Sequence, residues 1–212
     1  MSRRKVSNPL ALAVLGSLSE RPMHPYEIGT LLRARHKNDS IKLNYGSLYT
    51  VVESLQRHGL IVPAEAEREG RRPERTVYSL TDAGRIEFVD WLSELLSTPV
   101  KEYTHFEAGL SFLPALPPAD VAARLRERAR ELELELVQMR SALGVFAASV
   151  PRLFWVEFEY RMVLRQAELD WTRDLAGEIE EGKLEGSEMW TTWHESEDAS
   201  GVVPANAHPE RP

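Results

Sequence analysis

The 212-residue sequence contains no cysteine, and this absence excludes several classes of protein at once. Disulfide scaffolds, thiolate metal sites and cysteine nucleophiles all need a residue that the chain does not have. A protein without disulfides suits a reducing compartment, so we expect a cytoplasmic location. Hydrophobic residues make up 42% of the chain, with five Trp, six Tyr and six Phe among them, which predicts a folded core rather than general disorder.

Long apolar runs are also missing. No segment approaches the roughly 20 apolar residues that a membrane-spanning helix needs. The run 10–18 follows Arg3, Arg4 and Lys5, as the core of a secretory signal would, but it is short and no small-residue cleavage site follows it. We therefore expect a soluble protein that is not exported and has no membrane partner.

The sequence signatures of catalysis are absent as well. It has no phosphate-binding glycine loop, no helix with paired histidines and no nucleophile elbow. His105 and Glu107 lie two residues apart, but two side chains do not make a metal site, and no motif supplies a third. We predict that the protein is not an enzyme and has no catalytic residues, metal site or cofactor.

Acidic residues outnumber basic ones, for a net charge of −7, but unevenly along the chain. Residues 1–90 have 14 Lys and Arg against 11 Asp and Glu, a balance of +3, whereas residues 91–212 have 12 against 22, a balance of −10. Electrostatic attraction depends on a surface rather than on a whole chain. A mildly basic amino-terminal half can therefore bind phosphates.

Three short helices are predicted before residue 60. The segment PLALAVLGSLSE begins with Pro9, a residue favoured in the first helical turn, and HPYEIGTLLRARHK repeats this arrangement with Pro25. In the third segment, NYGSLYTVVESLQRHGLI, Asn44 can cap the helix and Gly59 follows its last periodic residue. All three show apolar residues at helical spacing.

A β-hairpin and a longer helix are predicted next. The short β-favouring runs LIVPAEAE and RTVYSL are joined by the charged segment REGRRPE. In TDAGRIEFVDWLSELL, Thr81 is the expected cap, and one stripe carries Ile86, Val89, Leu92 and Leu96. Three helices followed by a hairpin is the order of a winged helix-turn-helix, whose third helix enters the major groove of DNA. The predicted fold class is mostly α with a small β wing.

The third helix has a polar side suited to DNA. At 100° per residue, the side opposite its apolar residues carries Ser47, Thr50, Ser54 and Arg57, with Tyr45 and Tyr49 flanking near the start. These groups can contact base edges or phosphates, and Gly46 leaves the helix start open to an anion. An ordinary solvent-exposed face stays open as the alternative, and Glu53 on this side would repel phosphate.

Arginines gather in the segment that joins the two strands. Arg71, Arg72 and Arg75 lie at the tip or shoulder of the predicted hairpin. Exposed arginines on a wing suit phosphate contacts or insertion into a minor groove, so we predict that they bind DNA. A solvated charged loop is the alternative.

Three segments carry a resemblance to a known family. LAVLGSLSERPMHPYEIGTLL, GSLYTVVESLQRHGLI and RTVYSLTDAGR resemble the PadR family of bacterial transcriptional regulators in spacing and in residue type, closely over residues 9–90 and less closely to about residue 182. The chain departs from the family pattern at Pro25, where glycine is common, and at Thr50, where proline is common. The resemblance implies a dimeric repressor, with Tyr49 and the start of its helix at the DNA and Arg71, Arg72 and Arg75 along the backbone.

The second half contains a heptad repeat between residues 119 and 150. One set of apolar residues recurs every seven positions, at Ala122, Ala129, Leu136, Leu143 and Val150, and the complementary set is Leu125, Leu132, Met139 and Phe146. Sustained repeats of this kind bury their stripe against another helix. We predict a homodimer formed by Leu125, Leu132, Leu136, Met139, Leu143 and Phe146, with a partner helix in the same chain as the alternative.

Pro151 begins another helix that is rich in aromatic residues. An antiparallel helix pair with its turn at residues 149–152 would cover them. Six aromatics form a candidate pocket for a small apolar or aromatic effector: Trp91, Phe106, Phe112, Phe154, Trp155 and Phe158. Packing of these side chains in the core is the alternative. An effector can act only if it binds two arrangements of the dimer with different affinities.

The expected organisation has three parts: a winged helix-turn-helix domain at 1–90, a helical, coiled-coil-like dimerisation domain at 91–185, and a disordered tail at 186–212 in which Trp190 and Trp193 dock locally. The predicted function is sequence-specific binding of double-stranded operator DNA by a dimeric transcriptional repressor, relieved by a small effector. The alternative is a winged-helix dimer that contacts proteins instead of DNA.

Overall fold

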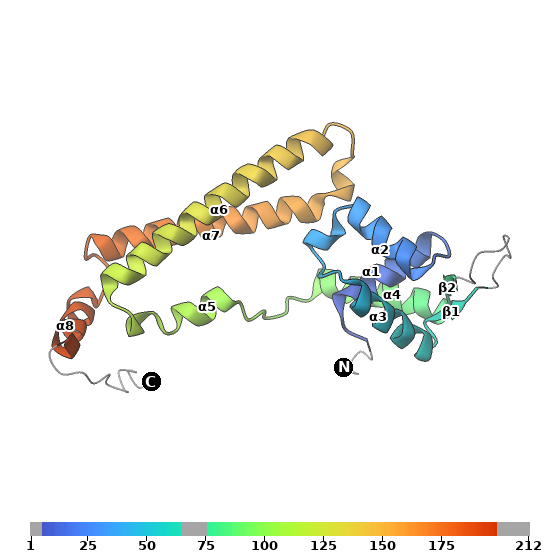
Figure 1. Cartoon of the computed structure of the whole chain (residues 1–212), viewed down its shortest axis with the longest axis horizontal. Helices are drawn as coiled ribbons and strands as arrows, with labels where there is room; N and C mark the ends of the chain where they lie inside the picture. Colours follow the sequence, from blue (N-terminus) through green and yellow to red (C-terminus); the bar gives the residue numbers. More distant parts are fainter. Residues whose placement is uncertain (1–5, 65–75, 199–212) are drawn as a thin grey trace. The chain divides into compact units, whose positions relative to one another are not determined.

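The structure, a computed structural model, describes residues 6–64 and 76–198 (Figure 1). The chain divides into two compact units, residues 1–101 and 102–212. The predicted fold class is confirmed: helices dominate, and two short antiparallel strands form the sheet. The division falls after residue 101 rather than at the predicted residue 90, because one helix continues across residue 90.

Three helices open the first unit: α1 (Pro9–Glu20), α2 (Pro25–Ala34) and α3 (Tyr45–Arg57). A 3-10 turn, η1 (Lys37–Asp39), lies between the last two. The predicted starts of all three helices are confirmed. The Asn44 side chain accepts from the backbone N–H of Ser47 at 2.7 Å, and Gly59 follows α3 with a positive φ of 70° that a glycine adopts without strain.

The start of α2 has a reciprocal cap. The Nδ1 atom of His24 accepts from the N–H of Tyr26 at 3.1 Å, and the Glu27 carboxylate accepts from the N–H of His24 at 3.4 Å. Both side chains satisfy amides that have no partner within the helix.

One apolar core joins the helices of the first unit. Its fully buried members come from every helix and from the first strand, and the largest are Leu10, Leu15, Met23, Ile28, Leu48, Leu55 and Ile61. Because α3 contributes Leu48 and Leu55 to this core, its orientation about its own axis is fixed by packing.

The sheet has two short strands, β1 (Ile61–Pro63) and β2 (Tyr78–Leu80), with Ile61 opposite Leu80. The turn between α1 and α2 adds a bridge: Met23 and Tyr78 exchange backbone hydrogen bonds of 3.1 and 3.0 Å. The base of the hairpin is therefore attached to the helices on the side of Met23.

Helix α4 (Asp82–Ser97) begins at the predicted cap, where the Thr81 hydroxyl accepts from the N–H of Gly84 at 3.0 Å. Gly84 packs directly on β1's leading residue: a Cβ at this position would lie 2.0 Å from the carbonyl oxygen of Leu60. The buried side of α4 contains Gly84 and Trp91, whereas the predicted stripe of Ile86, Val89, Leu92 and Leu96 is exposed.

The second unit is a helical hairpin with short helices at its open end. Its long elements are α6 (Pro118–Phe146) and α7 (Val156–Glu180), preceded by α5 (His105–Leu110) and the 3-10 turn η2 (Leu113–Ala115). A second 3-10 turn, η3 (Arg152–Phe154), leads into α7, so the predicted turn between the long helices is confirmed. They run antiparallel, as Figure 1 shows.

The predicted heptad repeat of α6 is buried against α7 of the same chain. Leu125, Leu132, Leu136 and Met139 are all at most 7% exposed, and they pack with Leu169, Ala176 and Ile179 of α7. This corrects their assignment as dimer contacts, because side chains already covered by α7 cannot also form the surface for a second chain. Leu143 is half-buried near the end of α6, and the side chain of Phe146 lies outside the described residues.

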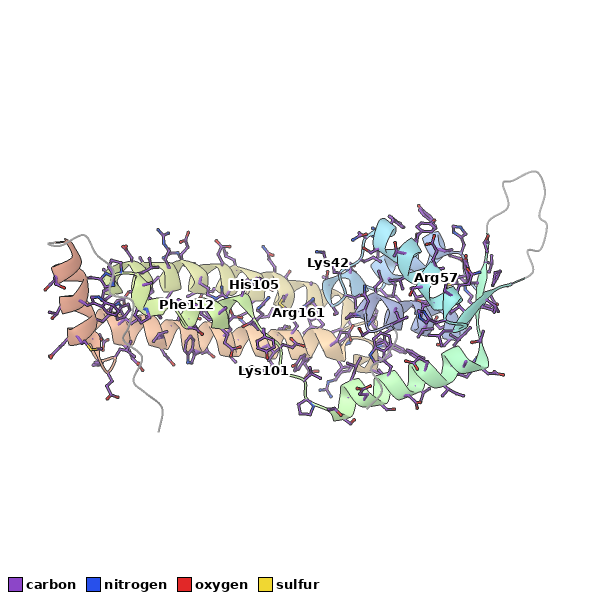
Figure 2. The ribbon with its side chains drawn as sticks, turned by 90° about the horizontal axis from the view of Figure 1, so that it is seen from below. Lys42, Arg57, Lys101, His105, Phe112 and Arg161 are labelled. Atoms are coloured by element: carbon purple, nitrogen blue, oxygen red, sulfur yellow. The ribbon has the colours of Figure 1, made fainter. Side chains whose placement is uncertain are left out.

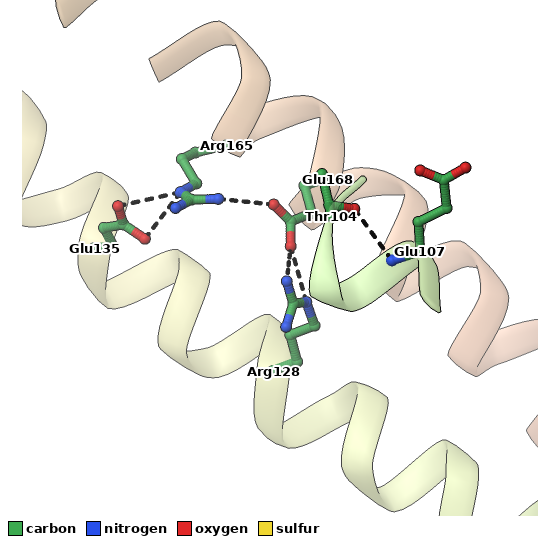
Figure 3. Close-up of polar contacts among 6 residues, drawn as sticks. All are labelled: Thr104, Glu107, Arg128, Glu135, Arg165 and Glu168. Atoms are coloured by element: carbon green, nitrogen blue, oxygen red, sulfur yellow. Dashed lines mark hydrogen bonds and ion pairs between the residues drawn. The ribbon is translucent and has the colours of Figure 1, made fainter. Parts of the chain in front are cut away.

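Ion pairs fix the register of the hairpin (Figure 3). The Glu168 carboxylate accepts from Arg128 of α6 and from Arg165 of α7, the latter at 3.0 Å, while Arg165 also pairs with Glu135 at 3.1 Å. Glu168 is only 19% exposed, so this network is more shielded from water than an ordinary surface pair.

Helix α8 (Ser187–Asp198) corrects the expected disorder of the tail. Its Trp190 is 6% exposed and packs with Val121, Leu125 and Ile179, and the indole N–H donates to the carbonyl oxygen of Leu116 at 2.9 Å. The expected local docking of Trp190 is thus present, but as part of a helix. The rest of the predicted tail lies outside the described residues.

Candidate nucleic-acid interface

Helix α3 presents one side to the core and the other to solvent. Leu48, Val51, Val52 and Leu55 are all buried. The opposite side exposes the phenol of Tyr49, which is 42% exposed, the hydroxyl of Thr50 and the guanidinium of Arg57. The predicted division of this helix into two sides is confirmed, while the role of each exposed side chain in DNA binding stays a prediction.

The hydroxyl groups of α3 are not equally available. Thr50 is exposed and donates to the carbonyl oxygen of Gly46 at 3.0 Å, which leaves its oxygen lone pairs free to accept. Ser47 and Ser54 are half-buried. Thr50 is therefore the hydroxyl best placed to accept a hydrogen bond from the amino group of a base.

Tyr45 is held in place by its neighbours. Its ring stacks on Tyr26 of α2 with a centroid distance of 5.5 Å and an angle of 7°, and the Arg33 guanidinium lies 4.4 Å from its centroid. Gly29 makes room for the ring, because a Cβ there would lie 2.9 Å from Cε1 of Tyr45. We infer that Tyr45 fixes the start of α3 against α2, which the sequence pattern did not indicate.

Cationic groups lie at both ends of α3. Arg57 is the last residue of the helix, and Lys42 precedes its N-cap by two residues; both are exposed (Figure 2). Neither has an ion-pair partner within the described residues. Sequence reasoning missed Lys42, although a lysine just before a predicted recognition helix was a usable signal.

Acidic groups of the first unit are largely neutralised by arginines. Arg35 hydrogen-bonds to Glu20 and lowers the pKa of that carboxyl, and Arg21, which lies 2.6 Å from Glu27, does the same for Glu27. Glu53 is exposed on α3, as predicted. The local charge available to a phosphate backbone thus comes mainly from Lys42 and Arg57, opposed by Glu53.

The predicted wing arginines, Arg71, Arg72 and Arg75, lie outside the described residues. Their predicted contacts with DNA remain predictions.

The six aromatics of the predicted effector pocket do not form one group. Trp91 belongs to the core of the first unit. In the second unit, Phe106 packs edge-to-face on Trp171 at 6.0 Å, whereas Phe154 precedes α7 by two residues. Since α7 rises 1.5 Å per residue, Trp171 and Phe154 are separated by roughly 25 Å. Phe112 and Phe154 are also mostly exposed, and Trp155 and Phe158 lie near the start of α7.

Among the described residues, no helix is both long enough and apolar enough to cross a membrane. Within the same part of the chain, His, Asp and Glu side chains do not gather in a group of three that could hold a metal ion.

Three helices, a strand pair beside the third, and an exposed polar side on that third helix define the winged helix-turn-helix class. Residues 14–90 match the model of the Transcriptional regulator PadR-like family. This part of the chain therefore belongs to the PadR-like family, and the protein is a PadR-like transcriptional regulator. No curated protein matches the sequence significantly.

Solved structures share the fold beyond the winged domain. Bacillus subtilis PadR in complex with operator DNA is 18% identical with a TM-score of 0.65, covering 81% of this chain and 99% of that one. The same protein in complex with p-coumaric acid is 17% identical with a TM-score of 0.66, covering 81% and 98%. The Vibrio cholerae virulence activator AphA is 19% identical with a TM-score of 0.60, covering 81% and 98%.

Proposed function

We propose that the protein is a homodimeric repressor that binds a specific operator by placing α3 of each copy in the major groove. The observation that carries this proposal is the packing of α3: Leu48 and Leu55 are buried in the core, which turns Thr50 and Arg57 to solvent on the opposite side. A groove-binding helix needs this fixed orientation. The similarity in fold to a PadR bound to operator DNA supports the proposal.

Two copies are needed because one helix in one groove makes few contacts, whereas two related copies read half-sites about one helical turn apart. We assign the dimer contact to the α7 outer stripe, defined as Val156, Tyr160, Val163, Leu164 and Trp171. Each is 48% exposed or more, and together they span about 100° on the side of α7 opposite its contact with α6. An exposed apolar stripe of this kind marks an interaction surface.

The test is a gel shift with DNA from upstream of the protein's own reading frame, at 50 and 200 mM salt. We expect a shifted band at low salt and a large loss of affinity at high salt, because cation–phosphate contacts release counterions. The matched control is Arg124→Ala, which removes an exposed cation from α6. Absence of a shift at both salt concentrations would favour the protein-binding alternative.

Repression is the proposed sign of regulation, and AphA is named an activator, so the sign needs its own measurement. A reporter driven by the upstream DNA should be more active when the protein is deleted. An effector would act by binding one arrangement of the dimer more tightly than the other.

A further inference from the structure

A groove lies at the open end of the helical hairpin, where α8 crosses the start of α6 and the end of α7. Its volume is about 710 Å³, which is within the range of small-molecule sites. The walls are formed largely by small apolar side chains, among them Pro118, Ala122, Ala123 and Ile179. Short side chains on facing helices leave this space open.

Helix α8 is fastened to the segment before α6 at two points. The buried indole of Trp190 donates to the Leu116 carbonyl oxygen at 2.9 Å, and Nε2 of His194 lies 2.9 Å from the Pro114 carbonyl oxygen. Because a carbonyl oxygen only accepts, Nε2 of His194 carries the proton. The groove is therefore bounded by a helix whose position is set by packing and by hydrogen bonds.

The polar part of the groove is acidic. Glu180, Glu195, Thr191 and His194 line it, and no Lys or Arg does. Arg126 donates two hydrogen bonds to Glu180, of 3.0 and 2.5 Å, and neutralises that carboxylate. Glu195 is exposed and has no ion-pair partner within the described residues. The surroundings have the same sign, since residues 102–212 contain 21 Asp and Glu against 11 Lys and Arg.

We propose that this groove binds a small organic cation: a primary ammonium group attached to an apolar body. The ammonium has three donors, and the carboxylate of Glu195, the hydroxyl of Thr191 and the outer lone pairs of Glu180 are acceptors that match them. No aromatic ring lines the groove, so it lacks the cage that recognises a quaternary ammonium. The apolar body lies against the Pro and Ala walls, and an anion is repelled.

The test uses three probes of similar size and different charge: 2-phenylethylammonium, neutral 2-phenylethanol and anionic 3-phenylpropanoate. Each is titrated calorimetrically into the full chain without DNA, so the result does not depend on operator binding. We expect the ammonium to bind, with an affinity that falls as salt rises, and the other two to bind at least tenfold more weakly.

Two variants locate the site. Glu195→Gln should lower affinity for the ammonium about tenfold, equivalent to about 1.4 kcal/mol, and Ala123→Phe should block binding by filling the groove. Glu188→Gln removes a charge from α8 outside the groove and should bind like the wild type. All three are exposed positions, and circular dichroism checks that each variant is folded.

The proposal is overturned if the ammonium gives no binding heat at millimolar concentration. Equal affinity for the neutral or anionic probe would overturn the charge assignment, and unchanged binding by both Glu195→Gln and Ala123→Phe would place the ligand elsewhere. Loss of operator binding in the gel shift would leave this result unaffected.

Discussion

Thr50 and Arg57 lie seven residues apart on the exposed side of α3, yet they offer different chemistry to DNA. A guanidinium at the end of the helix contacts phosphates, which carry no sequence information, whereas a hydroxyl on the middle of the helix contacts a base edge. The two side chains should therefore affect affinity and specificity separately.

We expect Arg57→Ala to weaken binding to operator and random DNA by the same factor and to reduce the salt slope by about 1 per contact. Thr50→Val keeps the shape but removes the hydroxyl, and should change the preference at one base position by about 1–3 kcal/mol. Competition gel shifts with single-base operator variants measure both effects. Equal losses on every sequence from Thr50→Val would contradict this division of roles.

Gly84 is the residue at which one added carbon should matter most for stability. A Cβ there would lie 2.0 Å from the Leu60 carbonyl oxygen, a backbone atom that also accepts from the N–H and the hydroxyl of Thr81. Since a backbone cannot rotate away as a side chain can, Gly84→Ala should destabilise the first unit by about 3 kcal/mol or more. Urea unfolding measures this change.

Gly144 of α6 is the matched control, because a Cβ there would meet nothing within 4 Å. Gly144→Ala should leave stability unchanged or raise it by about 0.5–1 kcal/mol, through better helix propensity. Similar losses in both variants would show that packing at Gly84 is not the cause.

At the scale of elements, the two long helices of the second unit are joined by ion pairs with a predictable pH dependence. The hydrogen bonds from Arg126 lower the pKa of Glu180, and those from Arg152 lower the pKa of Glu159. A carboxyl whose pKa is lowered by folding stabilises the fold fully above its unfolded pKa, near 4.5, and loses this contribution as the pH falls through the folded value.

We therefore expect Glu180→Gln to lower the melting temperature of the hairpin at pH 7 and to have a smaller effect at pH 3, where the wild-type carboxyl is protonated. Thermal unfolding followed by circular dichroism at pH 7, 5, 4 and 3 tests this. Glu178→Gln, an exposed acid on α7 without a resolved ion pair, is the control. A difference between wild type and Glu180→Gln that grows as the pH falls would contradict the sign of the effect.

The sequence predicted where helices begin better than it predicted what they contact. Asn44, Pro25 and Thr81 are local signals, because a cap acts within its own first turn. The heptad repeat of α6 predicted a partner helix but not its chain, since α7 of the same chain and α6 of another present equivalent apolar surfaces. Helix α8 was missed because SEMWTTWHESED has few apolar residues, and Trp190 stabilises it through tertiary contacts.

The candidate site shows the same division. The exposed side of α3 follows from helical periodicity, which is a property of the local sequence. The stack of Tyr45 on Tyr26 and the aromatic contacts of Phe106 depend on which helices lie together, and no spacing in the sequence encodes that.

At the scale of the whole molecule, the proposed dimer contact can be separated from the fold of each chain. Val163→Asp combined with Leu164→Asp changes two exposed residues of the α7 outer stripe, so the helices should remain intact while the dimer dissociates. Sedimentation velocity should then show monomers, and operator affinity should fall. Met189→Asp, at an equally exposed apolar residue of α8, is the control and should remain dimeric.

Leu136→Asp should behave differently, because this residue is 2% exposed between α6 and α7. Burying an unpaired carboxylate there should unfold the hairpin, which circular dichroism would detect as lost helix. Monomers from Val163→Asp and Leu164→Asp with helix content also lost would argue against the α7 outer stripe as a separate contact surface.

The closure of the heptad repeat inside one chain has a consequence for assembly. Each newly made copy can complete its long helices alone, with α6 and α7 shielding one another, before it meets a second copy. Subunits can therefore exchange between dimers without unfolding. A cell that makes two versions of this regulator would contain mixed pairs, and a version defective in DNA contact would disable its normal partner.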